Sequence, residues 1–223
     1  MKYLVIHPDD RSTDFLSDIY KGLENYTLVT QSDNKEELIA MIRSHDYVFM
    51  LGHGCGNGLL GVGKFPGLAV DDSFASALKE KGINLCGVWC HADDFFNFHG
   101  LSGFYTGMII SEVSEANFMR VKANQDEVTD SNRNFAKIIG EHLYLIDNPY
   151  VMAKEVKKMY GIVKNGVTKF NMDRIYGRKR FRGNKKRKKI LTSFGIFGSM
   201  FLKDGENKKG DEFWDNFDNL LER

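Results

Sequence analysis

The sequence is poor in cysteine, in proline and in long apolar runs. It contains three cysteines and three prolines in 223 residues. A small, odd number of cysteines does not fit the disulfide framework of a secreted domain, so we expect reduced thiols and a cytoplasmic protein. No apolar run approaches the roughly 20 residues that a membrane-spanning helix needs, and the first apolar stretch is too short for a signal peptide.

Net charge is almost absent, at +1 for the whole chain, but the charges are unevenly distributed. Residues 174–189 are strongly basic, 190–202 are apolar, and 203–223 are mostly acidic and amide-rich. No signature of a nucleic-acid-binding fold accompanies the basic run, so we do not expect a nucleic acid partner. Membrane contact of this basic and apolar tail is disfavoured. We expect a linker and an amphipathic helix, Asp211–Leu221, that docks on the core or on a protein partner.

The first part of the chain alternates short apolar runs with apolar positions at helical spacing. The expected strands are 2–7, 26–30, 47–51, 84–90, 105–113 and 167–175, and helices are expected between most of them. This order predicts right-handed parallel crossovers and an α/β sheet covered by helices on both faces. We therefore divide the chain into an α/β domain, 1–176, and a short C-terminal appendage, 177–223.

Two of the expected strands end in reactive side chains. Tyr47–Leu51 is followed by Gly52, His53 and Gly54, and the run from Asn84 to Cys90 ends in the cysteine itself. Neighbouring parallel strands place their carboxyl ends at one edge of the sheet, so we expect His53 and Cys90 to lie together. An imidazole can take the proton of a thiol and so create a nucleophile. The backbone N–H groups of Gly54 and Cys90 would form the oxyanion hole.

A strand ending in His-Gly and, after a loop and a helix, a strand ending in Cys resembles the caspase-like cysteine peptidases. This clan also holds legumains, gingipains, clostripain, metacaspases and separases. The resemblance covers about residues 1–176 in element order, and its specific motifs are His53-Gly54 and Cys90. It implies a caspase-like three-layer fold and a hydrolase that cleaves peptide bonds through a thioester, with His53 as base and Cys90 as nucleophile. No cofactor or metal is expected. It also implies that residues 110–116 form a wall of the pocket for the residue cleaved after.

Acidic side chains are expected near this pair. Asp93 and Asp94 follow the cysteine, and Glu112, Ser114 and Glu115 follow the expected fifth strand. Carboxylates at the rim of the site would select a Lys or Arg side chain at the cleaved position. A solvated acidic loop is the alternative interpretation of the same residues.

Other functions compete with the peptidase. The fold could be kept as a catalytically inactive module that binds or regulates a protein. The run from His7 to Asp10 resembles the zinc-binding motif of N-acetylglucosamine-type deacetylases, which implies a zinc-dependent amide hydrolase. That motif continues with Glu where this chain has Arg11, and a later His-x-x-His is absent. A turn closed by proline and aspartate is therefore favoured there. Cys55, beside the histidine, is a weaker rival nucleophile.

Overall fold

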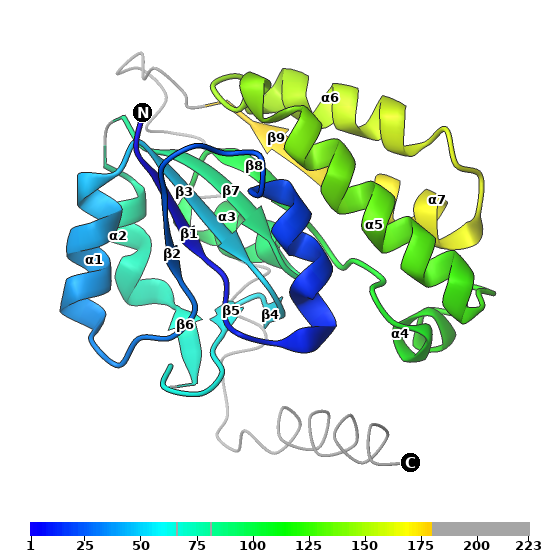
Figure 1. The fold of residues 1–223 in the computed structure, drawn as a ribbon, viewed down its shortest axis with the longest axis horizontal. Helices are drawn as coiled ribbons and strands as arrows, with labels where there is room; N and C mark the ends of the chain where they lie inside the picture. Colours follow the sequence, from blue (N-terminus) through cyan, green and yellow to red (C-terminus); the bar gives the residue numbers. More distant parts are fainter. Residues whose placement is uncertain (66, 81, 180–223) are drawn as a thin grey trace, which may run out of the picture. The chain divides into compact units, whose positions relative to one another are not determined.

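The computed structural model describes residues 1–65, 67–80 and 82–179, and the description below concerns these residues. A six-stranded sheet with the order β2-β1-β3-β7-β8-β9 lies at the centre (Figure 1). Its strands are β1 (Tyr3–Ile6), β2 (Tyr26–Val29), β3 (Tyr47–Leu51), β7 (Asn84–Val88), β8 (Gly103–Thr106) and β9 (Ile175–Arg178). The first five pair in parallel, and β9 pairs antiparallel with β8. The expected α/β class with a mostly parallel sheet is confirmed.

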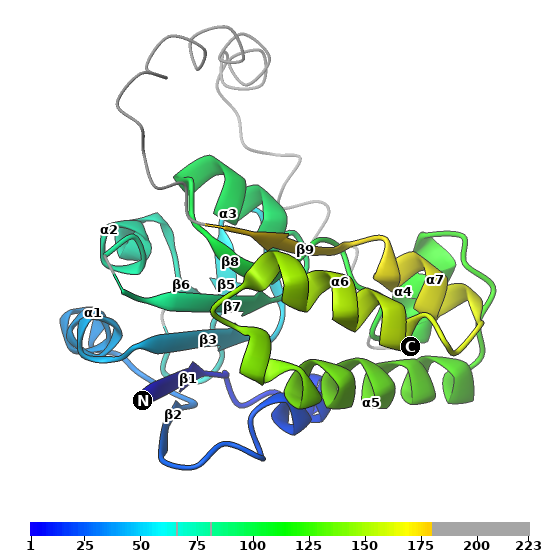
Figure 2. The ribbon, with the colours of Figure 1, turned by 90° about the horizontal axis from the view of Figure 1, so that it is seen from above.

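Helices cover both faces of this sheet, as expected (Figure 2). The helices are α1 (Lys35–Ser44), α2 (Ala75–Leu78), α3 (Ala92–His99), α4 (Val113–Phe118), α5 (Gln125–Glu141), α6 (Pro149–Tyr160) and α7 (Gly166–Met172). Three 3-10 helices are η1 (Arg11–Ile19), η2 (Asp72–Phe74) and η3 (Leu143–Leu145). Helices α1, α2 and α3 pack on one face, and η1, α5 and α6 pack on the other. We call these the α3 face and the α5 face.

The central strands are buried on both faces, and this burial explains why they are continuous apolar runs. Every residue of β3 is buried. Val48 and Met50 pack on the α3 face, whereas Phe49 and Leu51 pack on the α5 face. The alternation of side chains along a strand thus fixes which face each following residue meets.

A second, three-stranded antiparallel sheet begins directly after β3. It consists of β4 (Gly54–Cys55), β5 (Gly58–Leu60) and β6 (Leu68–Val70). The glycines permit close backbone approach, because a Cβ atom on Gly58 would lie 1.9 Å from the carbonyl oxygen of Val70. The glycine-rich stretch is therefore folded into a small sheet and is not an open loop.

Two expected strands were placed wrongly. The strand expected at 105–113 ends at Thr106, and α4 begins at Val113 because the side chains of Glu112 and Glu115 form a capping box. Most of 167–175 is helix α7, whose N-terminus is capped by the Asn165 side chain accepting a hydrogen bond from the Thr168 N–H at 2.7 Å. The sixth strand begins only at Ile175.

The residues that follow Cys90 form helix α3. It begins after His91, which has a left-handed backbone (φ 66°) and supplies no side-chain cap. Ala92, Phe96 and His99 are buried at helical spacing on the α3 face. Their burial stabilises a helix that lacks an N-terminal capping signal.

Strand β9 continues to Arg178, so the ordered sheet extends slightly beyond the expected boundary at 176. The predicted amphipathic segment Asp211–Leu221 and most of the basic linker lie outside the described residues. In the described ranges, no helix has the length and apolar character needed to cross a bilayer.

Candidate active site

The structure brings the ends of β3 and β7 side by side. Leu51 pairs with Val88, and the N–H of Gly52 extends this ladder by donating to the Val88 carbonyl at 3.1 Å. His53 and Cys90 each follow two residues after this pair. The two residues expected to carry the chemistry therefore leave adjacent strands at the same edge of the sheet.

Both side chains also turn toward the same face. Along β7, Cys86 and Val88 pack on the α5 face, and the thiol of Cys90 continues there, donating to the carbonyl of Ile109 at 3.4 Å. His53 contacts helix η1, which covers that face. Both residues are partly buried. A nucleophile and its base must come within hydrogen-bond reach of each other, and a shared edge and a shared face are compatible with that.

Trp89, whose side chain packs on the α3 face, links the segment that carries His53 to the segment that carries Cys90. Its indole Nε1–H donates to the carbonyl of Cys55 at 3.1 Å. A Cβ atom on Gly54 would lie 2.0 Å from Cδ1 of Trp89, so only glycine fits there. The Gly54 backbone therefore lies against the residue that precedes Cys90, near where an oxyanion donor is expected.

A chain of hydrogen bonds supports the imidazole of His53. Its Nε2 lies 2.7 Å from Oγ of Ser12, and this hydroxyl donates to Oδ1 of Asp10 at 2.7 Å. The Ser12 N–H donates to the same oxygen at 2.9 Å. Burial works to raise the pKa of Asp10, but the two hydrogen bonds from Ser12 and the charge of His53 outweigh it and hold the pKa below its ordinary value.

Hydrogen bonds of the buried His7 stabilise the turn that carries Asp10. Nδ1 of His7 lies 3.0 Å from the Tyr20 hydroxyl, and Nε2 lies 3.2 Å from the Thr13 hydroxyl, which donates to the carbonyl of Asp10 at 3.0 Å. Burial lowers the pKa of His7, which keeps the ring neutral. Both ring nitrogens are engaged within the protein, so this arrangement favours a structural turn over a zinc site.

Cys90 is held as a thiol in this structure. Burial and the negative charge of Glu115 raise the pKa of Cys90 to about 12. Within the described residues, neither Cys90 nor His53 forms a hydrogen bond with the other; each has a different partner. The rival Cys55 is also partly buried, and Cys86 is fully buried in the core.

Glu115 lies in the first turn of α4 and interacts electrostatically with Cys90 and His53. It is 6% exposed, and its Oε2 accepts from the Ser111 N–H at 2.6 Å, the Ser111 hydroxyl at 3.0 Å and the Glu112 N–H at 3.1 Å. Burial raises the pKa of Glu115 despite these bonds and the charge of His53. Glu112 caps the same helix, and its carboxylate accepts from the Ser114 hydroxyl at 3.2 Å.

Asparagines from two distant helices fix the segment between β8 and α4. Asn171 receives the N–H of Ile110 at 2.8 Å and donates to the carbonyl of Ile110 at 2.9 Å. Asn132 donates to the carbonyl of Ser111 at 2.7 Å. Sequence reasoning missed both residues, because side-chain bonds to a distant backbone leave no local pattern.

Asp93 and Asp94 begin α3, whose apolar side chains pack on the α3 face. Their carboxylates interact with each other and with His91, and Oδ1 of Asp93 is buried without a hydrogen-bond partner in the described structure. Ligand atoms of His91, Asp93 and Asp94 lie within 4.8 Å of one another, but His91 and Asp94 are exposed, and such groups are common without a metal. Of the five residues expected to bind substrate, Glu115 interacts electrostatically with both Cys90 and His53.

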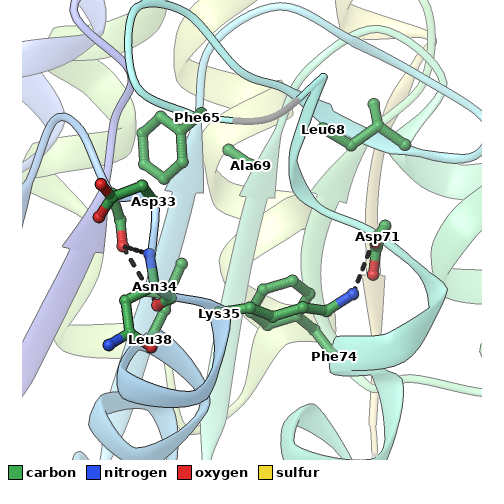
Figure 3. A pocket seen from close by; sticks show the side chains of 10 residues that line it. Asp33, Asn34, Lys35, Leu38, Phe65, Leu68, Ala69, Asp71 and Phe74 are labelled. Atoms are coloured by element: carbon green, nitrogen blue, oxygen red, sulfur yellow. Dashed lines mark hydrogen bonds and ion pairs between the residues drawn. The ribbon is translucent and has the colours of Figure 1, made fainter.

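A small hollow lies elsewhere, between the start of α1 and the β5–β6 segment (Figure 3). Its volume is about 50 Å³, room for a few water molecules. Lys35 crosses it to pair with Asp71 at 3.1 Å and lies over the ring of Phe74. None of the predicted site residues lines this hollow, so it does not compete with the pair as a site.

A scan of the sequence against protein-family models and a search of curated proteins both found no match. The assignment of chemistry therefore depends on the geometry of the strand ends and on the contacts of their side chains.

Proposed function

We propose that the chain is a cysteine endopeptidase with a caspase-like fold, in which Cys90 is the nucleophile and His53 the base. The observation that carries the proposal is the pairing of β3 with β7, which delivers both side chains to one edge and one face of the sheet. The mostly parallel, helix-covered sheet is also of the kind that this resemblance implies. Two short motifs and the sheet thus favour the same chemistry.

The proposed reaction follows the order of a thiol peptidase. His53 takes the proton of Cys90, and Sγ attacks the peptide carbonyl carbon while backbone N–H groups of Gly54 and Cys90 bind the developing oxyanion. The C–N bond breaks, and the amine leaves with the proton from His53. Water then adds to the thioester with His53 as base, releasing the carboxylic acid and restoring the thiol.

A basic residue before the cleaved bond fits the charges around the pair. Asp10 and Glu115 both interact electrostatically with His53. Glu112 and Ser114 lie on the same helix terminus as Glu115. A Lys or Arg side chain would be attracted to these carboxylates.

A second function, a non-catalytic module that binds a protein, is favoured by one observation. The thiol and the imidazole bond to Ile109 and Ser12 in this structure, and the thiol pKa is raised to about 12. A peptidase needs these contacts to be exchanged for a mutual one during turnover, whereas a binding module does not.

Iodoacetamide labelling of the full chain across pH, with peptide mapping, separates the two functions, and a fluorogenic peptide library is tested in parallel. We expect preferential labelling of Cys90, slowed by His53→Ala, and cleavage that Cys90→Ala abolishes. Cys55→Ala is the matched control, since Cys55 is also a partly buried thiol. Slow labelling that His53→Ala leaves unchanged, with no cleavage of the library, would overturn the peptidase and favour the binding module.

A further inference from the structure

The hydrogen count of Ser12 assigns a tautomer to His53. A serine hydroxyl has one hydrogen, and here it is donated to Oδ1 of Asp10 at 2.7 Å. The same oxygen lies 2.7 Å from Nε2 of His53, so it can only accept in that bond. Nε2 must therefore carry a hydrogen. A neutral imidazole has one N–H hydrogen, which leaves the lone pair on Nδ1.

We propose that Ser12 is a positioning residue that, held by Asp10, keeps His53 in the Nε2–H tautomer, so that Nδ1 takes the proton of Cys90; this rests on the proposed function. Ser12 touches neither the thiol nor the substrate in this scheme. Its effect is on the ring, which it orients and whose basic nitrogen it selects.

The same chain of bonds prepares the site for the charge that forms. When Nδ1 accepts the thiol proton, the ring becomes positive, and the carboxylate of Asp10 lies one hydroxyl away from it. Oδ1 of Asp10 is fixed by two bonds from Ser12, and the Asp10 carbonyl is fixed by Thr13. A dipole and charge already in place stabilise the imidazolium without rearrangement.

The turn between β1 and η1 thus has a function beyond ending a strand. Asp10 on this turn and Glu115 on α4 both interact electrostatically with His53. Of these two, Asp10 is the one that reaches the ring through a hydrogen-bonded hydroxyl. Removing the hydroxyl of Ser12 should therefore change the tautomer, whereas removing the charge of Glu115 should not.

The test uses ¹⁵N-histidine NMR of the full chain, which reports the protonated ring nitrogen without requiring activity. We expect His53 to show Nε2–H in the wild type and in Ser12→Thr, and a mixture of tautomers in Ser12→Ala. Ser17→Ala, which removes a hydroxyl from the same 3-10 helix, is the matched control. An Nδ1–H signal in the wild type, or no change in Ser12→Ala, would overturn the assignment.

Alkylation of Cys90 near pH 7 is the second measurement. We expect Ser12→Ala to slow it about tenfold and Ser12→Thr to restore most of the rate. An unchanged rate in a folded Ser12→Ala variant would overturn the positioning role. If the protein cleaves peptides but Ser12→Ala leaves the tautomer of His53 unchanged, the role of Ser12 is refuted and the proposed peptidase function is not. A Ser12-dependent tautomer without any peptide cleavage would refute the peptidase and leave the tautomer assignment supported.

Discussion

The negative charge of Glu115 acts on the thiol of Cys90 and opposes its ionisation. Glu115 is buried because its carboxylate folds back to cap α4, accepting from the backbone of Ser111 and Glu112. One carboxylate thus has two effects: it stabilises a helix terminus, and it adds to burial in raising the pKa of the Cys90 thiol.

Replacing Glu115 with glutamine should lower the pKa of Cys90, because the charge is removed while an amide oxygen can still accept from Ser111. We expect alkylation of Cys90 near neutral pH to become about threefold faster. Glu127→Gln is the matched control, since Glu127 has the same capping role on α5. A slower or unchanged rate in Glu115→Gln would contradict the charge effect.

Stability should depend on pH through His7. Burial lowers its pKa in the folded chain from the ordinary value of 6.5, so below that pH the unfolded chain binds a proton that the folded chain does not. The free energy of unfolding should therefore fall as the pH drops below about 6.5, by at most roughly 1.4 kcal/mol per pH unit from this group. Urea unfolding of wild type and His7→Gln between pH 5 and 8, about the range in which histidine titrates, measures this dependence. Equal slopes for the two proteins would refute it.

Asn171→Ala should destabilise the segment that holds Ile109 and Ile110. Asn171 is fully buried, and its loss leaves the N–H and carbonyl of Ile110 without these partners. We expect a loss of about 2–3 kcal/mol in the free energy of unfolding and faster hydrogen exchange at Ile110. The exposed Asn117→Ala should change stability by less than about 0.5 kcal/mol. Similar effects of the two variants would show that the side-chain bonds of Asn171 contribute little.

Gly54→Ala should be poorly tolerated, because its Cβ atom would lie 2.0 Å from Trp89. We expect a loss of about 1–3 kcal/mol, since the indole must shift to make room. Gly22→Ala is the control, as a Cβ atom there would meet nothing within 4 Å. Calorimetric melting of both variants gives the comparison, and equal melting temperatures would contradict the packing described here.

The two strands that carry the candidate site were predicted from the sequence because they are buried on both faces. Continuous apolar runs at 47–51 and 84–90 marked β3 and β7, and the parallel pairing of these strands places the segments of His53 and Cys90 at one edge of the sheet. Helix α3 has no capping signal in the sequence, because His91 precedes it in a left-handed conformation and supplies no capping side chain.

The bond between Ser12 and His53 could not be predicted. The two residues are 41 positions apart, and only the folded turn after β1 brings them together. The capping role of Glu115 had a local signal, because a carboxylate three residues after Glu112 is typical of a helix start. The effect of Glu115 on the pKa of Cys90 had no local signal in the sequence, since it depends on the fold bringing α4 near the end of β7.

The bond from the Trp89 indole to Cys55 limits how the site can move. It joins the side chain of the residue before Cys90 to the backbone two residues after His53, and the indole also fills the space beside Gly54. The segments of the proposed nucleophile and base are therefore tied together, whereas rotation about the side-chain bonds of Cys90 and His53 is left free by this contact. Exchange between the contacts described here and a direct contact of Cys90 with His53 should therefore be a rotamer equilibrium that needs no rearrangement of the sheet.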